Sequence, residues 1–140
     1  FEGYLWDPPR AKQAILDCAR ISHEAGREMS MTLSDSFCVG RYRAEFLDLM
    51  RSGTVDIVFA NEQEALSLYE TDSFAEALDR IAKDCKLAAV TMGDQGAVIV
   101  KNDQRIRVPA TKVESVVDTT GAGDLFASGF LFGYMGPNKF

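Results

Sequence analysis

This 140-residue chain has few cysteines, and nothing in their spacing would join them in one site. Cys18, Cys38 and Cys85 are odd in number, far apart and without C-x-x-C spacing. That pattern argues against a disulfide framework and against a zinc or redox centre. We therefore expect three reduced thiols in a cytoplasmic protein.

Long apolar runs and an excess of positive charge are also lacking. No run of about 18 apolar residues predicts a membrane helix, and no basic segment leads into an apolar one as in a signal peptide. The 15 Lys and Arg against 21 Asp and Glu give a formal net charge of -6, which repels nucleic acid and anionic membrane surfaces. We expect neither as a partner, so an anionic ligand must be held by local geometry.

Two common nucleotide-binding motifs are missing as well. There is no G-x-x-x-x-G-K-[ST] sequence, and Phe126 stands where a dinucleotide G-x-G-x-x-G would have its third glycine. The sequence therefore contains no motif that would indicate a P-loop enzyme or a Rossmann oxidoreductase.

What is present is the pattern of a globular α/β protein, with 46% hydrophobic and 26% charged residues. Apolar spacing predicts a helix after Asp7 that ends at Gly26, a helix over 41–53, a helical turn over 62–68, and a helix opened by a Ser73 and Glu76 capping box. Strands are predicted over 28–34, 55–61, 87–93, 96–101, 105–108 and 112–117. This order predicts a mainly parallel sheet flanked by helices, with an antiparallel edge.

Both ends of the sequence predict a fragment of a larger domain. Residues 1–6 (FEGYLW) alternate like the middle of a strand, and the chain stops soon after an apolar helix containing FLFGYM, which is typical of a buried central helix. We expect residues 1–140 to form a single partial domain. Structural positions are expected for His23 on a solvated helix face and Trp6 in packing. Asp35 follows a predicted strand end and is expected in a turn, with a place lining the active cleft as the alternative.

The chemistry is concentrated in VVDTTGAGDLFASGF, from Val116 to Phe130. Gly121 and Gly123 have no Cβ to keep an anion from the backbone, and a helix beginning there adds unpaired amides, including those of Ala122 and Gly123. A carboxylate beside such an anion site would repel the anion, so its presence there indicates a function. Asp124 is suited to accept the proton of an attacking hydroxyl while the amides stabilise a transferring phosphoryl group, although a first-turn acid favoured by the helix dipole is the plain alternative.

At these residues the chain resembles the PfkB or ribokinase-like carbohydrate and nucleoside kinases, whose second signature is similar to DTTGAGDLFASGF. The resemblance implies that Asp124 is the catalytic base and that Gly121, Ala122 and Gly123 form the anion hole. It also implies that Asp118 and Thr120 lie near a monovalent-cation site, which would take K⁺.

Two upstream stretches match the same family in the same order. Asn61 and Glu64 resemble its N-x-x-E element, which helps hold hydrated Mg²⁺ and the nucleotide phosphates, although the same pair also fits a helix capping box. A T-x-G-x-x-G turn that lines the ATP site is matched by Thr91, Gly93 and Gly96, which by themselves also fit a hairpin.

The resemblance thus implies the nucleotide-binding half of a cytoplasmic kinase that uses ATP and Mg²⁺ to phosphorylate a small sugar or nucleoside. The likeness of LSDSFCVGRYRAEF favours nucleoside-type or other small-sugar members. The family's acceptor pocket and lid, its first glycine-rich signature and its extreme C-terminal segment have no match here, and a homodimer would form through such parts. A non-catalytic nucleotide-binding or regulatory module and a purely structural α/β domain remain alternatives.

Overall fold

The computed structural model describes residues 1–136, which fall into two compact units. The first is Phe1–Ala110, and the second begins at Thr111.

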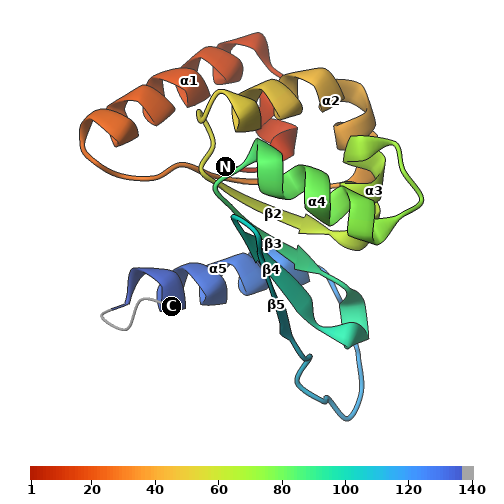
Figure 1. The fold of residues 1–140 in the computed structure, drawn as a ribbon. Coiled ribbons are helices and arrows are strands. Elements are labelled where there is room, and N and C mark those ends of the chain that lie inside the picture. The colour runs from red at the N-terminus through yellow and green to blue at the C-terminus, as the bar shows by residue number, and fades with distance from the viewer. Residues whose placement is uncertain (137–140) are drawn as a thin grey trace. The chain divides into compact units, whose positions relative to one another are not determined.

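The first unit is built on a five-stranded mixed sheet with the order β1-β2-β3-β4-β5 (Figure 1). β1 pairs with β2 and β2 with β3 in parallel, whereas β3, β4 and β5 are joined by antiparallel pairing. The strands are β1 (Ser30–Thr32), β2 (Ile57–Asn61), β3 (Leu87–Thr91), β4 (Ala97–Lys101) and β5 (Gln104–Val108). The predicted α/β class with an antiparallel edge is confirmed.

Helices connect the parallel strands, because a parallel pair needs a crossover connection. α2 (Ser36–Arg51) runs between β1 and β2, and α3 (Glu62–Tyr69) and α4 (Phe74–Asp84) run between β2 and β3. η1 (Gly3–Trp6) and α1 (Pro9–Glu24) precede β1, and a short 3₁₀ turn, η2 (Gly93–Gln95), joins β3 to β4. Figure 1 shows α2, α3 and α4 grouped on one side of β2, and these three helices contact one another.

The core of this unit lies between those helices and the sheet. Phe46 of α2, Leu68 of α3 and Ile81 of α4 are at most 1% exposed and pack with strand residues such as Val58 and Val90. Truncating a fully buried phenylalanine to alanine costs about 3–5 kcal/mol. This is a large part of the free energy of unfolding of a typical domain, so Phe46 alone is important for stability. The apolar face predicted for the helix after Ser73 is confirmed: Ala77, Leu78 and Ile81 are buried, and Phe74 and Ala82 are partly buried against the same core.

Several element ends follow the predicted signals. Gly26 has φ +66° just after α1, which favours glycine at that position. Ser73 accepts the Glu76 amide at 3.3 Å as the cap of α4, but Glu76 turns to Thr71 and Arg80 and does not complete a capping box.

Two predicted helix starts were wrong. The helix predicted from residue 41 begins at Ser36, because Asp35 caps it by accepting the Cys38 amide at 2.6 Å. At α1 the cap is Pro8, and the predicted cap, Asp7, accepts instead from Arg41 and Tyr42.

Two predicted strands were also wrong. Residues 1–6 contribute one bridge from Glu2 to Thr32 before turning into η1, where a Cβ at Gly3 would lie 2.9 Å from Leu33 O. Residues 112–117 form no strand in the described structure: Val113, Val116 and Val117 are 66–94% exposed and no neighbouring strand pairs with them. Alternating β-branched residues need a partner strand before they form a ladder.

The second unit contains one helix, α5 (Ala122–Met135), preceded by an exposed loop. Leu125, Phe132 and Met135 are 64–87% exposed, so the expectation of a buried central helix is not met in this chain. Apolar composition predicts that a face is suited to burial, but the covering surface must come from other residues. Within residues 1–136, no helix combines the length and the apolar character needed to cross a membrane.

Candidate functional site

The first candidate group stands at the carboxyl ends of two neighbouring parallel strands. Asn61 ends β2 and Thr91 ends β3, and the strand register pairs these two residues directly. Thr91 Oγ1 donates to Ala60 O at 3.4 Å, which ties its hydroxyl to the end of β2. Ligands of open α/β sheets bind outside the carboxyl ends of the strands, so this edge is the expected place for a nucleotide site.

Asn61 and Glu64 form a reciprocal pair at the start of α3. Asn61 Oδ1 accepts the Glu64 amide at 2.8 Å, and Glu64 Oε2 accepts the Asn61 amide at 2.9 Å. In addition, Asn61 Nδ2 donates to Glu64 Oε1 at 2.6 Å. This is the capping box that the sequence allowed, and it fixes both side chains at the sheet edge without assigning them a ligand.

Glu64 is unusual because it is a buried carboxylate without a basic partner. It is 6% exposed, and no Lys, Arg or His in the described part of the chain pairs with it. Burial is the main cause that raises its carboxyl pKa, the Asn61 amide opposes this, and the negative charge of Asp35 adds to the rise. A cation brought to this edge would relieve the unfavourable charge.

The donor set fits hydrated Mg²⁺ better than a fully protein-ligated ion. Mg²⁺ keeps several of its waters and takes few direct protein oxygens. Across residues 1–136 there is no group of three or more His, Cys, Asp or Glu side chains arranged to hold a metal ion. Glu64, with Asp35 nearby, therefore suits contact through water.

The turn after β3 contains two glycines with different surroundings. Gly93 has φ +60°, and a Cβ added there would meet nothing within 4 Å. Gly96 has φ +94°, and its Cβ would lie 2.0 Å from Val108 O and 2.7 Å from the Ala110 nitrogen. Gly96 is therefore required by packing against the end of β5, whereas Gly93 presents an open backbone surface near Thr91.

The second candidate group forms the loop and first turn of α5. Asp118 Oδ1 accepts the Thr120 amide at 2.9 Å, and this hydrogen bond is the largest cause that lowers the Asp118 carboxyl pKa. Gly121 caps α5 with φ +73°, a conformation that favours glycine, and no neighbour would lie within 4 Å of a Cβ at Gly123. The loop thus leaves the backbone open to a ligand.

The amides of this turn are not equivalent. Ala122 donates to Thr119 O at 3.0 Å, and Leu125 donates to Gly121 O at 2.9 Å. Within residues 1–136, no acceptor lies in hydrogen-bond geometry with the Gly123 and Asp124 amides. These two groups, at the positive end of a 14-residue helix, are the ones open to an anion, and the Asp124 carboxylate stands beside them.

The remaining singled-out residues have structural positions. Trp6 is 4% exposed and donates its indole N–H to Glu45 at 2.7 Å, which confirms the packing role. His23 lies 2.8 Å from Asp56 on the exposed side of α1. Asp35 is more than a turn residue, because it caps α2 and its charge acts on Glu64; its place directly after β1 was the signal for this.

Known proteins similar to this chain are kinases of sugars and nucleosides. A family model described as pfkB family carbohydrate kinase matches residues 7–138. A solved structure of a probable sugar kinase from Rhizobium etli CFN 42 is 78% identical, and one of adenosine kinase from Sinorhizobium meliloti is 70% identical; each superposes with a TM-score of 0.94 over 96% of this chain and 41% of the other. A cytidine kinase from Thermococcus kodakarensis is 39% identical over 102 residues, which is 66% of this chain and 36% of that protein. The chain thus spans less than half the length of these relatives.

Proposed function

Because this chain belongs to the pfkB family of carbohydrate kinases, we propose that it forms the nucleotide-binding and catalytic half of an ATP-dependent phosphotransferase. The acceptor is a hydroxyl group of a sugar or nucleoside. The observation that supports this most strongly is the start of α5, where a left-handed glycine cap, two unoccupied amides and the Asp124 carboxylate stand together. The acceptor pocket that the family resemblance implies has no match in this sequence.

In the proposed reaction, Asp124 acts as the general base. It accepts the proton of the acceptor hydroxyl while that oxygen forms a bond to the γ-phosphorus of ATP. The bond between the γ-phosphorus and the bridging oxygen breaks, and ADP leaves with the electron pair. The proton on Asp124 then returns to solvent.

The Gly121–Gly123 segment supplies the anion hole. The Gly123 amide points from the helix start without an acceptor, so it is free to donate to the phosphoryl oxygens as their charge develops. The Ala122 amide is already engaged with Thr119 O, so its part in this hole requires that bond to open. The helix dipole adds a fixed positive potential, which lets a chain of net charge -6 hold a phosphate.

The other predicted residues position the nucleotide. Thr91 and the open backbone at Gly93 contact ATP, and Gly96 keeps that turn in shape. Asn61 and Glu64 would hold Mg²⁺ through water, and the ion would neutralise charge on the ATP phosphates.

Asp118 and Thr120 lie by the proposed K⁺ site. Their mutual hydrogen bond keeps the Asp118 carboxylate charged and oriented beside the loop that leads to α5.

A nucleoside, with adenosine first, is the acceptor that the relatives favour, since a 70% identical structure is named adenosine kinase. The 78% identical structure is named a probable sugar kinase, so both classes must be tested. The experiment is ATP consumption by the full-length protein with Mg²⁺ and K⁺ across adenosine, other nucleosides, ribose and fructose. Turnover with one acceptor supports the proposal and names the substrate; ATP binding without any turnover would favour a regulatory nucleotide-binding module instead.

A further inference from the structure

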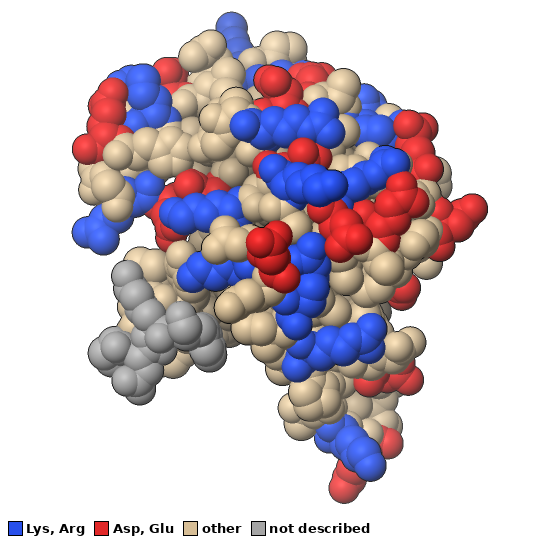
Figure 2. Space-filling view, viewed as in Figure 1, with Lys and Arg blue, Asp and Glu red and all other residues tan. Residues whose placement is uncertain are grey.

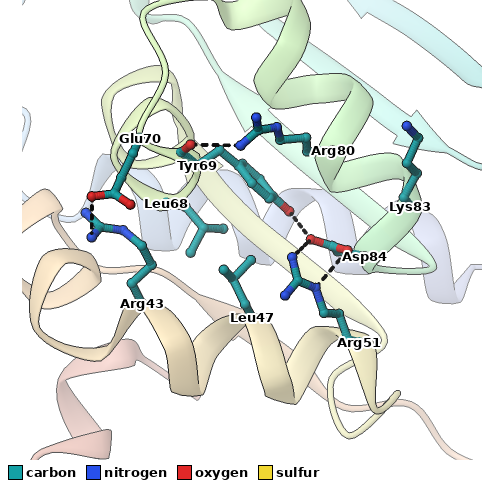
Figure 3. A pocket seen from close by; sticks show the side chains of 9 residues that line it. All are labelled: Arg43, Leu47, Arg51, Leu68, Tyr69, Glu70, Arg80, Lys83 and Asp84. Carbon is teal, nitrogen blue, oxygen red and sulfur yellow. Dashed lines mark hydrogen bonds and ion pairs between the residues drawn. The ribbon is translucent and has the colours of Figure 1, made fainter.

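A pocket lies among the helices α2, α3 and α4 of the first unit, apart from the candidate site (Figure 3). Its volume is about 350 Å³, which falls within the range of small-molecule sites. It is lined by Arg43, Leu47, Arg51, Leu68, Tyr69, Glu70, Arg80, Lys83 and Asp84. None of these residues belongs to the proposed phosphoryl-transfer site.

Helix periodicity brings the basic residues to this pocket. Arg43, Leu47 and Arg51 follow one another at intervals of four on α2, so they share one face of that helix. Arg80 and Lys83 are three residues apart on α4 and share a face in the same way. Figure 3 shows Leu47 between the two arginines of α2, with Leu68 of α3 close above it.

Basic groups outnumber acidic groups in the lining. Arg43, Arg51, Arg80 and Lys83 stand against Glu70 and Asp84. This local excess contrasts with the net charge of -6 for the whole chain. Figure 2 shows Lys and Arg side chains interleaved with Asp and Glu over the helical part of the molecule, so the pocket collects positive charge on an otherwise mixed surface.

One ion pair in the lining, between Arg51 and Asp84, is held by several hydrogen bonds and has a mostly buried carboxylate. Arg51 holds Asp84 through two hydrogen bonds of 3.0 and 3.1 Å, and the Tyr69 hydroxyl donates to the same carboxylate at 3.0 Å. The Asp84 side chain is 13% exposed. We therefore expect the hydrogen bonds of Arg51 and Tyr69 to Asp84 to persist when a ligand binds.

The other basic groups differ in how they are held. Arg80 donates to Tyr69 O at 3.0 Å and to Glu76 at 2.6 Å. Arg43 Nε donates to Ser67 O at 3.0 Å, and Arg43 Nη1 pairs at 3.0 Å with Glu70, whose side chain is 70% exposed; such exposed pairs contribute little. Lys83 has no ion-pair or hydrogen-bond partner among residues 1–136, and its four-carbon side chain can turn its ammonium toward a ligand.

We propose that this pocket binds a small metabolite with at least two phosphate charges and a compact apolar portion. Arg43 and Lys83 bind the phosphates, and the half-buried Leu47 contacts the apolar portion. Arginine forks and lysine ammonium groups are the side chains that recognise phosphate in proteins. The proposal stands apart from the phosphoryl-transfer function, because it requires only the first unit and its own lining residues.

The position of the pocket also gives it a route to the sheet edge. Glu64 lies in the first turn of α3, and Tyr69 and Glu70 lie at its other end, about 8–9 Å away at 1.5 Å per residue. A ligand that orders the end of α3 acts on the helix that carries the Asn61–Glu64 pair.

The test is isothermal titration calorimetry of pyrophosphate into the full-length protein, in EDTA and about 0.15 M salt, where screening suppresses weak surface attraction. EDTA removes Mg²⁺ and so disfavours binding of pyrophosphate at the ATP site. The variants are Lys83→Gln and Arg43→Gln, and the charge-matched control is Lys101→Gln on β4, outside the pocket. Thermal unfolding of each variant verifies that it is folded.

We expect each pocket variant to weaken pyrophosphate binding about tenfold, the scale of one charge-assisted hydrogen bond, and the control to bind like the wild type. Binding that all three variants share equally would overturn the proposal by placing the probe elsewhere, for example at α5. Absence of binding at millimolar pyrophosphate would overturn it as well. Because no acceptor or ATP is used, either result is independent of whether the kinase activity exists.

Discussion

Replacing Gly96 by alanine is predicted to destabilise the first unit far more than the same change at Gly93. The new Cβ at Gly96 would lie 2.0 Å from Val108 O, whereas ordinary contacts begin near 3.4 Å. The end of β5 must therefore move by about 1 Å or more, and such overpacking costs about 1–3 kcal/mol. The backbone at Gly96, with φ +94° and ψ -134°, adds about 1–3 kcal/mol of strain for any residue with a Cβ.

The sum is a loss of about 2–6 kcal/mol in the free energy of unfolding. Gly93→Ala is the matched control, because it lies in the same turn with φ +60° and its Cβ meets nothing within 4 Å. Its cost is left-handed strain of about 1–2 kcal/mol, offset by about 0.4–1 kcal/mol from a less flexible unfolded chain.

Urea denaturation measures this difference. Trp6 is 4% exposed in the same unit, so its fluorescence reports unfolding, and circular dichroism at 222 nm checks that the two probes agree. We expect Gly96→Ala to be less stable than Gly93→Ala by about 3 kcal/mol, the difference between the midpoints of the two ranges. Equal stabilities would refute the packing argument at Gly96.

Three further changes test the site. Asn61→Ala should lower the free energy of unfolding by about 1 kcal/mol, because it removes the cap of α3. A urea titration measures this loss. Burial raises the pKa of the Glu64 carboxyl group, so the folded state favours its protonated form. The stabilisation of the folded state by this protonated form is lost as the pH rises above the ordinary pKa of 4.5. The stability of Glu64→Gln relative to the wild type should therefore improve between about pH 4 and pH 7, and a difference that stays constant would contradict that shift. Gly123→Val should weaken ATP binding at least about tenfold, measured by calorimetry, because a branched side chain covers the open amides, and undiminished affinity would place the anion hole elsewhere.

Much of the fold could be predicted because its signals are local. The alternation of strand and helix after Ser30, the glycine after α1 and the apolar face of α4 were readable from spacing alone. The segment 112–117 was misread because its alternation resembles a strand, while strand formation depends on a partner that the sequence pattern does not reveal. Asp35 was underestimated for a similar reason, since its effect on Glu64 depends on the packing of β1 beside β2.

The candidate site was predictable in its residues but not in their local bonding. Sequence spacing alone allowed both a metal-binding and a capping role for Asn61 and Glu64, and the structure contains the capping box. It also shows that the Glu64 carboxylate is buried, a property that no motif encodes. The engagement of the Ala122 amide by Thr119 O likewise depends on the turn geometry set by Gly121.

The most direct test of the proposed mechanism compares Asp124→Asn with the wild type in the full-length protein, measuring ATP affinity and phosphoryl transfer on the same samples. The substitution keeps the size of the side chain and removes its ability to accept a proton. The account predicts ATP affinity within a few-fold of the wild type and turnover lowered at least ~10²-fold, the scale of a lost general base. Unchanged turnover in the variant would contradict it.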